Sequence, residues 1–551
     1  MKLPKIPLAQ TVIKLCKAKS VKHIIISPGS RNAPLTIGFS NHDYFKCYSI
    51  VDERSAAFFA LGIAQQLNEP VAILCTSGSA LLNYYPAIAE AFYSDVPLIV
   101  LSADRPKHLL GIGDGQTIDQ ENVFANHILY SANLREDQQE ANEVEINEAL
   151  NIAKAKQGPV HINIPFNEPL YDEVNEFSVF PESIVFDSET LEIEDLKSYQ
   201  SIWKSAKQKL VLVGVNTPNT VEQRYLDILA NDQSVVVFTE TTSNLHHDNF
   251  FPSIDQIIAP LDSDGLELLR PEIVLTFGGL IVSKKIKAFL RDSKPNHHWH
   301  IDTKKANNTF FCLNKHFKYN INSFFEVFLQ NYQSQTSDYN RYWNGVKQLR
   351  LDKHNTYLES IPYSDLMVFD AILKSIPNDR ILHLGNSSTI RYTQLFNLNK
   401  TLKVYCNRGT SGIDGSTSTA IGAASVSKDQ TVFITGDLSF FYDSNALWNN
   451  YIPSNFRIIV INNNGGGIFR ILPGHKNSDN FETYFETKHQ LTAKQLCEMY
   501  GFEYSTANSI PQINNEMHSF YNNGEKPKLL EIFTPRTIND EILLNYFKSI
   551  K

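Results

Sequence analysis

Two apolar stretches in the last third of the chain each end in residues that can bind a metal ion. The run at 431–435 is followed by Gly436 and Asp437, and the run at 456–461 by three asparagines and three glycines. In a parallel sheet the ends of neighbouring strands lie together, so Asp437 and an asparagine amide oxygen are expected to meet. Such oxygens suit Mg²⁺, which keeps phosphate oxygens in its shell. The spacing therefore predicts a Mg²⁺–diphosphate site; a plain turn is the alternative, because Asp and Gly commonly end strands.

A second acidic group follows a strand near the start of the chain. In VDERSAAFFALGIAQ (51–65), Asp52 and Glu53 stand between a strand and an apolar helix. A carboxyl group in a partly dehydrated pocket has a shifted proton affinity and can take part in acid–base chemistry. The alternative is a helix N-terminal acid stabilised by the helix dipole. The metal motif elsewhere in the chain favours the catalytic interpretation.

The overall charge excludes several classes of partner. A net charge of -9 and a pI of about 6.0 give no bulk attraction to nucleic acid or anionic membrane, so local basic groups must hold any acidic ligand. The N-terminus lacks a signal-peptide pattern, and no apolar run reaches the roughly 18 residues of a membrane span. Six cysteines lie far apart without a CxxC pair, which favours a reduced, cytoplasmic protein.

The elements that would position these residues repeat along the chain. Short β-branched runs alternate with helical stretches such as 55–66 and 80–92, which predicts an α/β fold of doubly wound parallel sheets. The strand candidates are 23–27, 47–50, 71–76, 97–104 and 157–170, then 209–214, 234–238, 272–279 and 298–302, then 380–386, 402–407, 431–437, 456–464 and 528–533.

A chain of 551 residues exceeds what one hydrophobic core supports. An acidic, irregular stretch at about 175–195 is expected to be a linker, and 331–345 a helical connector. The sequence therefore predicts three α/β domains, over residues 1–180, 195–345 and 355–551.

Several motifs resemble one group of enzymes. The GD at 436–437 and the NN ending at Asn464, 27 positions after Asp437 (464 − 437), resemble the thiamine-diphosphate signature. Leu438 stands in place of the glycine that is usual at the third position of the signature, which points to a subgroup. Further motifs are similar to the SEPHCHC (2-succinyl-5-enolpyruvyl-6-hydroxy-3-cyclohexene-1-carboxylate) synthase family of menaquinone biosynthesis: SPGSRNAPL (27–35), the stretch from CTSGSALLNYYP to LSADRP (75–106), GQTIDQ (115–120), GNSSTIR (385–391) and NRGTSGIDG (407–415).

The resemblance implies a transferase that uses thiamine diphosphate with Mg²⁺, or Mn²⁺ as an alternative. This family decarboxylates 2-oxoglutarate and adds the succinyl carbanion to isochorismate in a 1,4-addition. The cofactor supplies the electron sink, while the protein orients the substrates and neutralises charge. Another thiamine-diphosphate carboligase or 2-oxo-acid decarboxylase is the rival interpretation.

The resemblance also implies roles for individual residues. Asp437, Asn464 and the Gly466 carbonyl would bind the metal, and Glu53 would hydrogen-bond N1′ of the aminopyrimidine. Cofactor contacts would come from Ser387, Ser411, Ile413, Gly436, Leu438 and Ser439. Substrate contacts would come from Ser30, Arg31, Arg105, Gln116, Lys284, Asn386, Arg391, Arg408, Ile468, Phe469 and Leu472.

Arginine is suited to the substrates because its planar fork binds a carboxylate bidentately and stays protonated. All four arginines are expected at strand ends or in loops. The alternative role for each arginine is a surface ion pair. For Ile413, and for Ile468, Phe469 and Leu472, the alternative role is packing in the protein interior. The resemblance further implies that 1–180 binds the pyrimidine end of the cofactor and 355–551 its diphosphate. The cofactor would lie between two subunits, so a homodimer is the minimum active unit and a homotetramer is an alternative.

Overall fold

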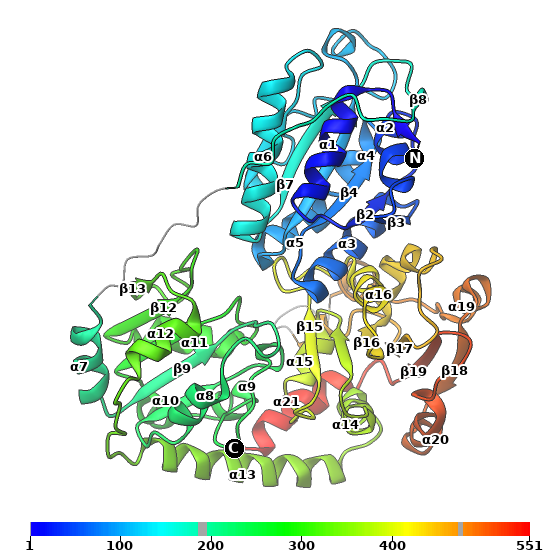
Figure 1. Ribbon diagram of the computed structural model, residues 1–551. Helices are drawn as coiled ribbons and strands as arrows, with labels where there is room; N and C mark the ends of the chain where they lie inside the picture. Colours follow the sequence, from blue (N-terminus) through cyan, green and yellow to red (C-terminus); the bar gives the residue numbers. More distant parts are fainter. Residues whose placement is uncertain (1, 186–194, 472–477) are drawn as a thin grey trace.

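Three lobes, each built on a parallel sheet, make up the computed structural model, which describes residues 2–185, 195–471 and 478–551 (Figure 1). Buried residues that alternate along a strand fall into different apolar clusters, so helices cover both faces of each sheet. In the first sheet, for example, Ile25 belongs to one cluster and Ile24 to another. The predicted α/β class with three doubly wound sheets is confirmed.

The first sheet has the strand order β3-β2-β4-β5-β7-β6, with all neighbours parallel. Its strands are β2 (His23–Ile26), β3 (Lys46–Ser49), β4 (Val71–Cys75), β5 (Leu98–Asp104), β6 (Tyr130–Asn133) and β7 (Val160–Pro165). Its helices are α1 (Pro7–Ala18), α2 (Ala33–Ser40), α3 (Glu53–Leu67), α4 (Ser79–Asn83), α5 (Tyr85–Ser94) and α6 (Gln139–Lys156). A small antiparallel pair, which was not predicted, joins β1 (Leu3–Pro4) to β8 (Glu173–Val174).

The central sheet is five-stranded and has the order β10-β9-β11-β12-β13. Its strands are β9 (Lys209–Val213), β10 (Val235–Phe238), β11 (Ile273–Phe277), β12 (His297–Ile301) and β13 (Leu313–Phe317). Its helices are α7 (Lys197–Ser205), α8 (Gln223–Ala230), α9 (Ile254–Ile258), α10 (Ser263–Leu269), α11 (Lys284–Ser293) and α12 (Ile321–Phe328). The long helix α13 (Tyr339–Ser360) then runs from this lobe to the third (Figure 1).

The third sheet has the order β15-β14-β16-β17-β19-β18. Its strands are β14 (Ile381–Leu384), β15 (Lys403–Cys406), β16 (Thr431–Gly436), β17 (Arg457–Asn462), β18 (Glu503–Ala507) and β19 (Lys528–Phe533). Its helices are α14 (Asp365–Ser375), α15 (Ser388–Thr393), α16 (Ser416–Val426), α17 (Asp437–Tyr442), α18 (Ile468–Ile471), α19 (Lys494–Tyr500), α20 (Ile510–Phe520) and α21 (Asn539–Ser549). Renumbered in chain order, the first and third sheets share one strand order, 2-1-3-4-6-5.

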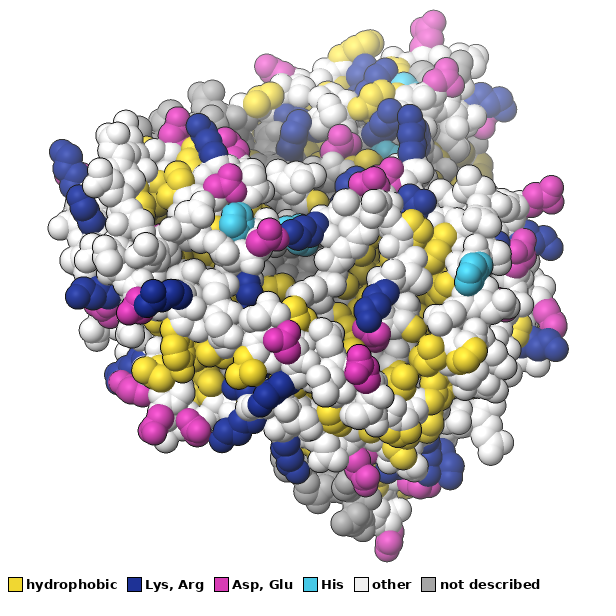
Figure 2. All heavy atoms as spheres, turned by 90° about the horizontal axis from the view of Figure 1, so that it is seen from below, with side chains coloured by type: hydrophobic (Ala, Val, Ile, Leu, Met, Phe, Trp, Pro, Cys, Tyr) yellow, Lys and Arg dark blue, Asp and Glu magenta, His cyan; other side chains and the backbone are white. Residues whose placement is uncertain are grey.

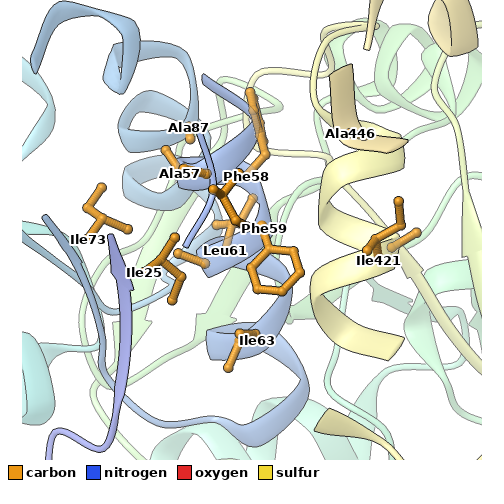
Figure 3. Packing of buried hydrophobic residues seen from close by; sticks show 14 of the residues in the cluster. Ile25, Ala57, Phe58, Phe59, Leu61, Ile63, Ile73, Ala87, Ile421 and Ala446 are labelled. Atoms are coloured by element: carbon orange, nitrogen blue, oxygen red, sulfur yellow. The ribbon is translucent and has the colours of Figure 1, made fainter. Parts of the chain in front are cut away.

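Helices α3 and α16 pack directly against each other and join the first lobe to the third. Figure 3 shows Phe58 and Phe59 on α3 and Ile421 on the neighbouring α16, and all three belong to one buried apolar cluster. Two glycines let the backbones approach closely. A Cβ on Gly62 would lie 2.0 Å from the Thr419 carbonyl oxygen, and one on Gly422 would lie 2.0 Å from the Phe59 carbonyl oxygen. The crossing is therefore reciprocal, because each glycine faces a carbonyl three positions before its partner glycine.

The central lobe has two apolar clusters of its own and meets the third lobe largely through polar contacts. Asn244 makes two hydrogen bonds to the backbone of Val404, donating over 2.9 Å and accepting over 2.8 Å. Gln256 donates to the Leu395 carbonyl over 2.8 Å. The main apolar exceptions are Val282 and the C-terminal end of α13, which join a cluster of the third lobe.

Several sequence expectations differ from the structure. The stretch 80–92 is two helices, because Pro86 lacks a backbone N–H and starts α5 afresh. The connector at 331–345 is helical only from Tyr339 onward. Arg391 lies within helix α15, where a strand end or loop was expected.

The surface carries both signs of charge. On the face in Figure 2, Lys and Arg side chains lie interspersed with Asp and Glu, in keeping with the modest net charge of -9. None of the helices in the described parts of the chain is both long and apolar enough to cross a membrane.

Candidate functional site

Most of the predicted site residues follow strands at the carboxyl edges of the first and third sheets. In the third sheet the chain reverses its winding between the adjacent strands β14 and β16, and open α/β sheets bind ligands at such a point. Asn386 and Ser387 follow β14, and Asp437 follows β16. In the first sheet, Arg31, Glu53 and Arg105 follow β2, β3 and β5.

Asp437 and the glycine loop form one corner of this site. Asp437 begins α17 and is buried, and its Oδ2 accepts a hydrogen bond from the Gly465 backbone over 3.0 Å. Asn464 has φ +62° and Gly465 has φ +151°, a conformation that side chains rarely adopt. A Cβ on Gly465 would also lie 2.8 Å from the Glu486 carbonyl oxygen. The loop that carries Asn464 is thus held against the Asp437 carboxylate.

The three asparagines after β17 have different surroundings. Asn462 donates to Glu531 over 2.7 Å, and Asn463 donates to Asp365 over 3.1 Å. These two side chains are turned into the protein. Asn464 is half-buried and stands nearest the glycines, which leaves its amide as the one placed to bind a ligand.

This corner fits Mg²⁺ and a diphosphate. One carboxylate, one amide and a loop carbonyl are hard oxygen ligands, which Mg²⁺ prefers. Among the described residues there is no group of three or more His, Cys, Asp and Glu that could hold a softer metal. Open space surrounds the Cα of Gly436, where a Cβ would meet no atom within 4 Å. A bulky anion can therefore approach the strand end beside Asp437.

The buried carboxyl group of Asp365 holds the residue next to Asn464 in place. Asp365 accepts hydrogen bonds from Asn463 over 3.1 Å and from the Thr534 hydroxyl over 2.6 Å. Burial raises the pKa of Asp365 to about 6, and the charge of Asp437 acts in the same direction. Asp365 was not predicted from the sequence.

Glu53 is the first residue of α3. Asp52 caps this helix, since its Oδ1 accepts the Ser55 N–H over 3.1 Å, and this cap fixes the position of Glu53 in the first turn. Burial raises the pKa of Glu53, and the charge of Asp52 raises it further. A carboxyl group that exchanges its proton nearer to neutrality is suited to acid–base chemistry. Among the described residues, no hydrogen bond or ion pair joins the Glu53 side chain to Asp437.

Asn386 ties the loop 407–415 to the end of β14. Its amide donates to the carbonyls of Asn407 and Gly412, each over 2.7 Å, and its oxygen accepts from Arg408 over 2.7 Å. At the far end of the loop, the Ile413 carbonyl accepts from Ser439 over 2.7 Å. Four predicted residues of three motifs are thus brought together.

The same loop is fixed by a residue of the first lobe that the sequence analysis missed. Glu90 of α5 is buried and accepts from the backbone of Gly409 over 2.7 Å, and from the backbone and hydroxyl of Thr410 over 2.6 and 2.9 Å. A lone acid among small apolar residues in AIAEAF is a signal that could have suggested a buried carboxylate. Its partners, more than 300 positions away, could not have been named.

The four arginines form two pairs. Burial lowers the pKa of Arg31, and the cation of Arg105 lowers it further. Burial likewise lowers the pKa of Arg391, and the cation of Arg408 lowers it further. Each arginine has a buried Nε without a hydrogen-bond partner among the described residues. Paired cations with spare donors are suited to carboxylate ligands.

Some of the Arg31 and Arg105 donors are already engaged by the protein. Arg31 donates to the Phe166 carbonyl over 2.9 Å and to Glu168 over 3.3 Å. Arg105 donates to the Gly115 carbonyl over 3.2 Å, next to Gln116. The Gly115–Gln116 segment therefore lies against the first arginine pair.

The remaining predicted residues are less closely grouped. Ser30, Gln116 and Lys284 are exposed, and Ser387 and Ser411 have φ of +65° and +61°. Ile468 and Phe469 begin α18, immediately after the glycines, and both are half-buried. Leu472 lies outside the described residues.

Two cavities bear on where ligands could bind. One of about 150 Å³ is lined by Lys287, Arg408 and Ser411, with Gly278 and Gly279 of the central lobe. A larger one of about 710 Å³ lies between the central and third lobes. Its lining contains none of the predicted site residues, so size alone does not indicate the site.

Three family models match the chain in order. Residues 6–123 match the thiamine pyrophosphate enzyme N-terminal TPP binding domain, 187–383 match the middle domain of thiamine pyrophosphate enzymes, and 385–532 match the C-terminal TPP binding domain. The model ranges include the Glu53 region and the Asp437 corner.

Full-length relatives are also similar. A protein of Christiangramia forsetii is 58% identical, with 100% of both chains covered. Proteins of Flavobacterium psychrophilum and Flavobacterium johnsoniae are 57% and 55% identical, with 99% of each chain covered. All three are named 2-succinyl-5-enolpyruvyl-6-hydroxy-3-cyclohexene-1-carboxylate synthase.

Proposed function

The chain belongs to the 2-succinyl-5-enolpyruvyl-6-hydroxy-3-cyclohexene-1-carboxylate synthase family of thiamine pyrophosphate enzymes, and from this premise we propose that it catalyses the reaction of that name. In this proposal it decarboxylates 2-oxoglutarate and adds the succinyl unit to isochorismate, as a transferase of menaquinone biosynthesis. The observation that carries the proposal is the buried Asp437 held against the Asn464–Gly466 loop, with one arginine pair in the same lobe and a second in the first lobe.

Asp437, Asn464 and the Gly466 carbonyl would hold Mg²⁺, with Mn²⁺ as an alternative. The metal would join the protein to the cofactor diphosphate, for which the space beside Gly436 is open. Thiamine diphosphate, when bound, supplies the nucleophilic carbon and the electron sink for decarboxylation. Ser387, Ser411, Ile413, Leu438 and Ser439 come after the strands β14, β15 and β16 along the chain and would contact the cofactor.

Glu53 would hold the proton that activates the cofactor. Its raised pKa favours the sharing of a proton between the carboxyl group and a ring nitrogen. The Asp52 cap fixes the backbone position of Glu53 in the first turn of α3.

The arginine pairs would divide the two acidic substrates between them. We assign a 2-oxoglutarate carboxylate to Arg391 and Arg408, which lie in the same lobe as Asp437. We assign isochorismate to Arg31 and Arg105. Ser30, Gln116, Lys284 and Asn386 would add polar contacts, and Ile468, Phe469 and Leu472 an apolar wall that excludes water.

The wider context of the enzyme is part of the proposal. Residues 1–180 would bind the pyrimidine end and 355–551 the diphosphate end, with 195–345 between them. Two subunits would complete each site, in a homodimer or homotetramer. A reduced, cytoplasmic location is supported by the six cysteines, all of which are free thiols.

The direct test is the mass of the product formed by purified protein, thiamine diphosphate, Mg²⁺, 2-oxoglutarate and isochorismate. We expect the SEPHCHC product and CO₂ release that depends on the cofactor. A product formed from 2-oxoglutarate alone, unchanged by isochorismate, would support the rival decarboxylase. Absence of CO₂ release in every mixture would refute both.

Glu53→Gln separates the proton role from binding. The amide keeps the size of the side chain but cannot accept the proton, so exchange of the cofactor C2 proton should slow by roughly 100-fold or more. Cofactor affinity, measured by calorimetry, should change little. An exchange rate equal to that of the wild type would remove Glu53 from the activating role.

A further inference from the structure

The segment 486–489 crosses the glycine loop that follows Asn464. It contacts this loop and also lies next to Asp437. The Glu486 carbonyl accepts from the Gly466 backbone over 2.6 Å. The backbone N–H of His489 donates to the Asn464 carbonyl over 3.2 Å. His489 therefore lies at the corner where the metal and the diphosphate are proposed to bind, although no sequence motif singled it out.

The hydrogen bonds of the His489 ring fix its tautomer. Nδ1 accepts from the Leu491 backbone N–H over 3.1 Å. A nitrogen that accepts cannot carry the proton of a neutral imidazole, so the proton lies on Nε2. The ring is also held edge-on to Phe441, at 5.5 Å between centroids and 85° between planes. His489 therefore presents an N–H donor in a fixed direction.

Among the described residues this donor has no acceptor. Nε2 lies 3.2 Å from Asp437 Oδ2, and the side chain is only 10% exposed. The N–H is not aimed at that oxygen, and across residues 2–185, 195–471 and 478–551 no group accepts its hydrogen bond. Buried polar groups are nearly always paired, so an unpaired donor beside a candidate anion site indicates a ligand contact.

We propose that His489 is a cofactor-binding residue whose Nε2–H donates to a diphosphate oxygen next to the metal held by Asp437. The proposal rests on the proposed function, because it requires thiamine diphosphate at this corner. Donation to an ionised oxygen is stronger than a neutral hydrogen bond, and a donor fixed in advance loses little freedom on binding. Of the two parts of the site, His489 would thus bind the anion and Asp437 the cation.

The test measures binding of thiamine diphosphate by calorimetry at saturating Mg²⁺, with four proteins. His489→Phe keeps a flat ring without a donor, and we expect its Kd to rise tenfold or more. His489→Gln places an amide N–H at nearly the same reach and should recover part of the affinity. His518→Phe, on the exposed face of α20, is the matched control and should bind like the wild type.

Three outcomes would overturn the role of His489. One is a wild-type Kd in His489→Phe. Another is full recovery of affinity in His489→Phe at an Mg²⁺ concentration above the one that saturates the wild type, since the histidine would then act only through metal binding at Asp437. The third is a His489→Gln protein no better than His489→Phe while both melt like the wild type without cofactor. If the wild type itself binds no thiamine diphosphate, this result refutes the proposed function and therefore also the role of His489. The other three outcomes refute only the role of His489.

Discussion

The first and third lobes are joined differently from the central and third lobes. Between the outer lobes, α3 and α16 share one apolar core, and two glycines bring the helix backbones into contact. The central lobe keeps separate cores and meets the third mainly through hydrogen bonds such as those of Asn244. Burial of apolar surface drives cooperative folding, whereas exchange of hydrogen bonds with water contributes less. The outer lobes are therefore expected to unfold as one unit, and the central lobe to open more independently.

The largest effect is expected from Gly422→Val in α16. The new Cβ would lie 2.0 Å from the Phe59 carbonyl oxygen, which belongs to rigid helix backbone. We expect a loss of roughly 3 kcal/mol or more in unfolding free energy, measured by urea denaturation. The control is Gly345→Ala in α13, where a Cβ meets nothing within 4 Å and should stabilise by about 0.5–1 kcal/mol. Equal effects of the two changes would refute the close crossing.

Glu90→Gln tests the polar contact between the same two lobes. The amide cannot accept from all three donors of Gly409 and Thr410, and it loses the charge, so we expect a loss of about 2 kcal/mol. Thr410→Val removes only the hydroxyl donor and should cost less. Denaturation curves of both variants would reveal the difference, and a reversed order would show that the loop does not depend on Glu90.

Asn244→Ala should loosen only the junction of the central lobe. The backbone N–H and carbonyl of Val404 would both lose their partner, at a cost of about 1–2 kcal/mol. Hydrogen exchange should rise around β15 and in the central lobe, but not at the α3–α16 crossing. Lys400→Ala, which removes an exposed ion pair with Asp248, is the control and should change stability by less than about 0.5 kcal/mol.

Asp443→Asn tests a pH response near the helix crossing. Burial raises the pKa of Asp443 from its ordinary 3.8 to about 7, although the backbone and hydroxyl of Ser418 donate to it. The folded protein then binds one proton more than the unfolded chain between these values. Stability should therefore fall by up to about 1.4 kcal/mol per pH unit as the pH rises from 4 to 7, and the variant should lack this part of the slope. Parallel pH curves for the two proteins would contradict the raised pKa.

Much of the fold could be predicted from the sequence because buried parallel strands are continuous apolar runs. The strands β6, β13 and β18, in contrast, lie at sheet edges, and their partly exposed, mixed sequences gave no such signal. Asp437 and Asn464 could be found because the ends of strands are marked in the sequence. His489 and Glu90 could not be assigned, since their roles depend on contacts made only in the folded chain.

The reciprocal crossing of α3 and α16 relates the two outer lobes to each other. Each helix follows the second strand of its own sheet, and the two sheets share one strand order. The two glycines also exchange equivalent contacts, as two copies do across a twofold axis. The outer lobes therefore meet through this helix pair in the way that two like subunits meet in a homodimer. A change on one helix is thus constrained by its counterpart, although both lie in one chain.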